Sequence, residues 1–222
     1  MGKTVILSCP TLRRELEAAL AEAENKAEVI YLPGELHSSP RHLKAYLQAM
    51  IDKQTDAERI VVCPSGCGGG TCGLKATTAE LIVPRTRDCL DLLLAARGSG
   101  EIDRPKHGVF YTDSWMEHTK NSAIDLKKAE ERFGPEKAHA KLRALYKGFE
   151  HFYIIDTGTY SVQEVRDYLE PLRAVLDGRV DMVKGEYGIL HKIAREEFDA
   201  DFWVIAKGSA MPDDAYIVNT DL

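Results

Sequence analysis

The alternation of short apolar runs with helix-like segments constrains the fold of this chain more than any other feature. In the first hundred residues, runs rich in valine, isoleucine and leucine alternate with segments whose apolar residues recur every three or four positions. Strands that alternate with helices form parallel, doubly wound sheets. The predicted strands are residues 4–7, 27–32, 60–62 and 80–83, and the predicted helices are 12–24, 40–51 and 88–96, with Ser39 and Asp88 as expected N-caps.

The same alternation resumes after a polar stretch, residues 97–107, which we interpret as a linker. The second half predicts strands at 108–111, 151–155, 179–183 and 202–205, helices at 161–176 and 189–194, and a long helical region to about residue 147 that is broken at residues 134–135. We therefore expect an α/β protein of two Rossmann-like lobes, residues 1–100 and 101–222, each with a parallel sheet, and a cleft between the lobes.

Composition and charge exclude several classes of protein. The net charge of −6 and the pI near 5.7 argue against a nucleic-acid-binding surface. The apolar runs are far shorter than the roughly 20 residues that a membrane span needs. The predicted first strand follows Met1 almost at once, which leaves no room for a signal peptide, so we expect a cytoplasmic location. There, cysteines serve as thiols or metal ligands more often than as disulfides.

The stretch at residues 60–74, IVVCPSGCGGGTCGL, carries the clearest functional signal. A predicted strand runs directly into a loop of glycines and thiols, and in an open parallel sheet ligands bind beyond the carboxyl ends of the strands. Glycine permits close approach of a ligand to the backbone, so Gly68, Gly69 and Gly70 are candidate ligand-binding residues. Cys67 lies between two glycines, where packing does not explain a thiol.

Thiols and an imidazole follow each predicted strand of the first half. Cys9 follows the first strand, His37 the second, Cys67 the third, and Cys89 opens the helix after the fourth. Soft thiolates together with imidazole suit zinc or an iron–sulfur cluster. The predicted ligands are therefore Cys9, Cys67 and Cys89, with His37 as the fourth ligand or a near neighbour. At a helix N-terminus, Cys89 is expected to have a lowered pKa.

Other interpretations of the cysteines and the glycine loop compete with metal binding. Cys63 completes an apolar strand and is expected to pack in the core, whereas Cys72 is either a loop thiol or a spare ligand. The glycine loop matches neither the Walker pattern nor a clean GxGxxG, so phosphate binding is a weaker alternative. Ser65 does not lie in a GxSxG context, which weighs against a hydrolase.

In the second half, polar and aromatic side chains follow the predicted strands. These residues are Asp113, Trp115, Tyr160 and Glu186. We expect them to face the cysteines across the cleft and to hold a polar ligand. The competing interpretation is that they are helix caps, turn residues and packing residues.

Several motifs together resemble a known family. They are ILSCP, LRREL, LHSSP, SGCGGG, LIVPR, DCL, DTGTY, KGEYGIL and DADFWVIAKG, and in this order they resemble the bacterial and archaeal family called domain of unknown function 1638. The resemblance implies cysteines at positions 9, 67 and 89 and a histidine at 37. It also implies an association with corrinoid-dependent methyl transfer in one-carbon metabolism, with a corrinoid as a further cofactor and a corrinoid protein or a small molecule as partner.

The sequence thus predicts a metal-binding protein with a cysteine-based zinc or iron–sulfur site, acting in corrinoid-dependent methyl transfer or corrinoid handling. Two alternatives stay open. One is an iron–sulfur protein of electron transfer or reductive activation, and the other is a small-ligand binding module without catalysis. The sequence leaves open whether the protein is an enzyme.

Overall fold

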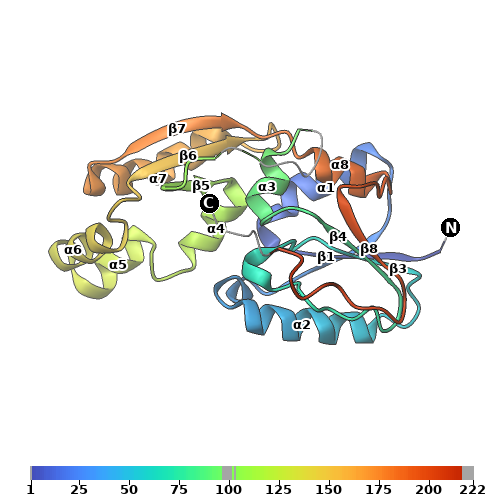
Figure 1. The fold of residues 1–222 in the computed structure, drawn as a ribbon. Coiled ribbons are helices and arrows are strands. Elements are labelled where there is room, and N and C mark those ends of the chain that lie inside the picture. The colour runs from blue at the N-terminus through green and yellow to red at the C-terminus, as the bar shows by residue number, and fades with distance from the viewer. Residues whose placement is uncertain (1, 97–101, 103, 217–222) are drawn as a thin grey trace, which may run out of the picture. The chain divides into compact units, whose positions relative to one another are not determined.

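A computed structural model describes residues 2–96, 102 and 104–216 (Figure 1), without the side chains of His37 and Ser38. The chain divides into two compact units. The first comprises residues 1–102 and 186–222, and the second comprises residues 103–185. In the part of the chain that is described, no helix combines the length and the apolar character needed to cross a membrane.

The sheet of the first unit has five strands in the order β2-β1-β3-β4-β8. Its parallel strands are β1 (Thr4–Ser8), β2 (Glu28–Tyr31), β3 (Arg59–Val62) and β4 (Glu80–Pro84), and β8 (Phe202–Ile205) pairs antiparallel with β4. All four parallel strands were predicted from the sequence. Their carboxyl ends meet at one edge of the sheet, as that topology requires.

Helices cover both faces of this sheet, which explains why its strands are apolar on both sides. Figure 1 shows α2 (Pro40–Lys53) on one face and α1 (Arg13–Glu22), α3 (Cys89–Leu94) and α8 (Gly188–Ala194) on the other. From α2, Leu43, Leu47 and Ile51 join strand residues in one apolar core. The short 3₁₀ helices η1 (Pro10–Leu12), η2 (Gly34–Ser38) and η3 (Cys67–Gly69) lie in the loops that follow β1, β2 and β3.

Both predicted N-caps are confirmed. The hydroxyl of Ser39 accepts a hydrogen bond from the amide of His42, with Pro40 in the first turn of α2. The Asp88 carboxylate accepts from the amides of Leu90 and Asp91 at the start of α3. These side chains satisfy amides that have no partner within the helix.

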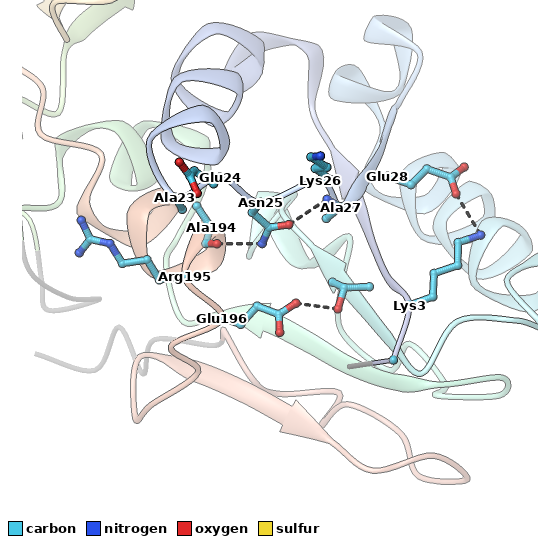
Figure 2. A pocket seen from close by; sticks show the side chains of 12 residues that line it. Lys3, Ala23, Glu24, Asn25, Lys26, Ala27, Glu28, Ala194, Arg195 and Glu196 are labelled. Carbon is cyan, nitrogen blue, oxygen red and sulfur yellow. Dashed lines mark hydrogen bonds and ion pairs between the residues drawn. The ribbon is translucent and has the colours of Figure 1, made fainter.

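The C-terminal residues were assigned to the wrong unit. The sequence predicted one lobe over residues 101–222, but residues 186–222 return to the first unit, where β8 covers the edge of β4. At the amino ends of β1 and β2, the Asn25 side chain donates to the carbonyl of Ala194 at 2.8 Å, and the Thr4 hydroxyl donates to Glu196 at 2.8 Å (Figure 2). Periodicity identifies a strand but not the sheet edge with which it pairs, and an unpaired edge favours pairing.

The second unit holds a three-stranded parallel sheet in the order β5-β6-β7. Its elements are β5 (Gly108–Tyr111), α4 (Asp113–Lys120), α5 (Leu126–Phe133), α6 (Pro135–Leu145), β6 (His151–Asp156), α7 (Val162–Leu176) and β7 (Arg179–Lys184). The predicted helix break is confirmed, because Gly134 has a φ of 77°, which glycine adopts readily. The cleft predicted between the lobes stays a prediction.

Candidate thiol site

The carboxyl edge of the first sheet carries the three cysteines that were predicted there. Cys9 directly follows β1, Cys67 lies in the loop after β3, and Cys89 is the first residue of α3 after β4. His37 lies in η2 after β2. A Cβ atom added at Gly68 would lie 3.1 Å from Pro40, three residues beyond His37, so the glycine loop approaches this segment too.

Backbone hydrogen bonds join the loop of Cys67 to the loop that leads into Cys89. The amide of Gly66 donates to the carbonyl of Thr86 at 3.0 Å, and the amide of Cys67 donates to the carbonyl of Arg87 at 2.8 Å. A Cβ atom at Gly66 would lie 2.4 Å from the Arg87 carbonyl oxygen. Glycine is therefore required at this position for the close approach of the two loops.

The backbone at Cys67 adopts a conformation that non-glycine residues rarely take. Its φ is 40°, next to Gly68 at 64° and Gly69 at 87°. The left-handed region costs a side-chain-bearing residue on the order of 1 kcal/mol or more. Strain of this kind persists where surrounding structure enforces it and is concentrated at functional sites.

The three thiols lie within electrostatic range of one another. The Thr11 hydroxyl donates to Cys9 Sγ at 3.0 Å and lies close enough to Cys89 to lower the pKa of that thiol against the effect of burial. The backbone of Cys89 in turn lies close enough to Cys67 to favour its thiolate. A charge on Cys9 acts on both other thiols, and a charge on Cys67 acts on Cys89. Thr11 was not singled out from the sequence, since nothing in the ordinary spacing of residues 9–11 indicates proximity to residue 89.

Burial keeps these thiols protonated in the absence of a cation. It is the main cause that raises the pKa of Cys9, of Cys67 to about 12, and of Cys89 well above its ordinary value. The expectation of a lowered pKa at Cys89 is therefore wrong. Desolvation outweighs the helix N-terminus, and the Asp88 carboxylate both caps that terminus and adds a negative charge.

Electrostatic interaction among the three thiols does not show that they are already arranged to coordinate a metal ion. Among the residues described, no three His, Cys, Asp or Glu side chains have the arrangement that holds a metal ion. Electrostatic coupling acts over several ångströms, whereas zinc ligands must all lie about 2–2.3 Å from one point. The side chain of His37 lies outside the described residues. Metal ligation by Cys9, His37, Cys67 and Cys89 thus stays a prediction.

The other two cysteines differ from each other. Cys63 is fully buried after β3, and burial raises its pKa to about 12, in agreement with the predicted role in core packing. Cys72 is also buried, and it lines a cavity beside the glycine loop.

The glycine loop uses its amides within the protein. Besides Gly66 and Cys67, the amide of Gly69 donates to the carbonyl of Gly66 at 2.8 Å, and that of Gly70 to the carbonyl of Cys67 at 3.2 Å. A phosphate cradle needs such amides to point at the ligand. Of the candidate ligand-binding glycines, Gly68 and Gly69 line the cavity, whereas Gly70 is buried against Leu43.

In the second unit, three predicted ligand-binding residues have local structural partners. The Asp113 carboxylate accepts from the amide of Ser114 at 2.6 Å in the first turn of α4. Trp115 packs against the second core and lies beside His118. Tyr160 packs against the same core and donates to the carbonyl of Ile155. These contacts agree with the plainer interpretation, and ligand binding by these residues stays a prediction.

Glu186 does not belong with those three residues. It opens the return of the chain to the first unit, and its amide donates to the carbonyl of Leu93 at 3.0 Å. The sequence grouped it with the second half because it follows β7.

Fold and site together define an α/β protein whose first unit gathers interacting thiols at the carboxyl edge of a parallel sheet. The chain belongs to the family described as protein of unknown function (DUF1638), whose family model matches residues 31–194. The match includes His37, Cys67 and Cys89 but begins after Cys9. No curated protein and no solved structure matches the chain.

Proposed function

We propose that this protein binds a thiophilic metal centre, zinc or an iron–sulfur cluster, through Cys9, Cys67 and Cys89. The observation that carries the proposal is the position of three buried thiols, from three separate loops, within electrostatic range of one another, with Thr11 bonded to Cys9 and near Cys89. Thiolates are the ligands that such metals prefer.

The burial of the thiols gives a metal a clear energetic role. A buried thiolate without a counter-charge is costly, and a bound cation removes that cost by replacing the protons. The carboxylate of Asp88 adds further negative charge near Cys67 and Cys89. A divalent cation or a cluster would thus stabilise these thiols in their ionised form.

The fourth ligand decides what the centre does. Three thiolates and the His37 imidazole make a closed tetrahedral zinc site, which stabilises a fold without catalysis. Without His37, one position is open to a substrate, and a metal there ionises a bound thiol or holds a corrinoid. The proposed role in corrinoid-dependent methyl transfer or corrinoid handling rests on the family resemblance alone.

Metal analysis of anaerobically purified protein tests the proposal. We expect bound zinc or iron in the native protein, its loss in Cys67→Ser, and its retention in Cys72→Ser. Full metal content in a folded Cys67→Ser variant contradicts the site. A brown protein with iron and sulfide selects the iron–sulfur alternative, and a colourless protein with one zinc per chain excludes it. An empty protein whose thiols all titrate without loss of fold selects the binding module.

A further inference from the structure

A cavity of about 500 Å³ borders the loop that carries Cys67. Gly66 and Gly68, the two neighbours of Cys67, line it together with residues 85–87 after β4. Tyr216 also lines it, and the Tyr216 hydroxyl donates to the carbonyl of Pro84 at 2.6 Å. A volume of this size lies in the range of roughly 300–1,000 Å³ that is usual for small-molecule sites.

The lining carries two arginines and one aspartate, although the whole chain is acidic. Arg87 is neutralised, because its guanidinium forms a bidentate pair with Asp91 at 2.7 and 2.9 Å. The side chain of Asp213 is exposed and lies 4.0 Å from Lys44. Arg85 is the cation that is left without an acidic partner among the described residues.

Arg85 is held in place by uncharged groups. Its Nε donates to the carbonyl of Phe202 at 3.2 Å, and its guanidinium lies 3.9 Å above the ring of Trp203. Within the described residues, its two terminal nitrogens have no hydrogen-bond partner. Stacking fixes the guanidinium without using those donors, which is how arginine is prepared to bind an oxyanion.

Thr86 supplies a second polar group. The residue lines the cavity, is 1% exposed, and its hydroxyl makes no hydrogen bond to any described atom. A buried hydroxyl without a partner costs about 1–3 kcal/mol. Rotation of the threonine side chain among its staggered rotamers lets this hydroxyl serve a ligand in the cavity.

We propose that this cavity binds a small organic molecule through an oxyanion, a carboxylate or a phosphate, held by Arg85 and Thr86. The site is complete without the proposed metal, since neither residue is one of the proposed metal ligands. The ligand would lie beside Cys67, so a metal centre there would act on a molecule that the cavity has already oriented.

Titration calorimetry with inorganic phosphate and with acetate tests the site and identifies the group. We expect one of the two probes to bind at one site per chain. Arg85→Met and Thr86→Val should each weaken binding roughly tenfold or more. Arg195→Met is the matched control, because Arg195 lines a different cavity, at the amino ends of β1 and β2 (Figure 2), and should bind like the native protein. Binding of neither probe, or unchanged binding by Arg85→Met, overturns the proposal.

Two further measurements test the site. The first separates ligand binding by Thr86 from a purely structural role. The second shows whether the site of Arg85 and Thr86 depends on the metal. Because the hydroxyl of Thr86 has no hydrogen-bond partner among the described residues, Thr86→Val should melt no lower than the native protein. A clearly lower melting temperature would assign Thr86 a structural role and overturn its part in the site. Cys9→Ser is expected to lose the metal but should still bind the probe. Loss of probe binding in this variant overturns a site built on Arg85 and Thr86.

Discussion

The amide of Cys67 donates a hydrogen bond of 2.8 Å to the carbonyl oxygen of Arg87. This contact joins the loop after β3 to the loop after β4, and it brings two thiols that are 22 positions apart in the sequence (67 and 89) within electrostatic range of each other. The thiol site therefore depends on how two loops meet, and not on a local cysteine motif.

Gly66→Ala should separate these loops. Gly66 has a φ of −58°, so alanine meets no backbone strain there, but its Cβ would lie 2.4 Å from the Arg87 carbonyl oxygen. We expect a loss of about 1–3 kcal/mol in unfolding free energy together with a loss of bound metal. Gly158→Ala is the control, since it strains a φ of 74° in open space and should leave metal content unchanged. Native metal content in Gly66→Ala contradicts the role of the loop contact.

Thr11→Val should weaken metal binding without unfolding the protein. The hydroxyl of Thr11 donates to the sulfur of Cys9 and lies near Cys89, and the loss of such an outer hydrogen bond typically costs 10- to 100-fold in metal affinity. Competition with a chelator measures the change. Thr78→Val removes a hydroxyl that donates to the carbonyl of Ile51, away from the thiols, and should bind metal normally. Equal affinities of the two variants would argue against a role for Thr11 in orienting the thiols.

Alkaline pH should destabilise the metal-free protein through Cys63. Burial raises the pKa of this thiol from 9.0 to about 12, so the folded state holds its proton where the unfolded state has released it. The resulting stability is fully present below pH 9 and is lost as the pH rises from 9 towards 12. The slope is about 1.4 kcal/mol per pH unit for one group.

Urea unfolding of chelator-treated protein at pH 8, 9 and 10 measures this slope. Cys63→Ala should be less stable at every pH because of the cavity that it leaves, but its stability should fall less steeply with pH. Parallel curves for the two proteins would mean that Cys63 does not titrate as burial requires.

Phe202→Ala should destabilise the first unit. Phe202 is 2% exposed at the start of β8, and truncation of a buried phenylalanine costs about 3–5 kcal/mol. Hydrogen exchange should become faster at the amides of β4, with which β8 pairs, than at those of β6. Phe149→Ala, at a side chain that is 41% exposed, should cost little. Faster exchange confined to β6 would support the single second lobe that the sequence predicted.

Local patterns along the chain were enough to locate the helices and strands and to predict which edge of the sheet carries the thiols. Hydrophobic periodicity and the caps Ser39 and Asp88 are local signals, and the parallel topology then brings the residues that follow β1, β3 and β4 together.

Packing in three dimensions was needed to learn which strand β8 joins, that Thr11 bonds Cys9 near Cys89, and that Arg85 and Thr86 line a cavity next to Cys67. It also reversed the expected pKa of Cys89, since desolvation depends on what surrounds a thiol and not on its place in a helix. Contacts across the fold determine which edges pair, which side chains are buried and which distant residues form hydrogen bonds. Hydrophobic periodicity along the chain does not predict these contacts.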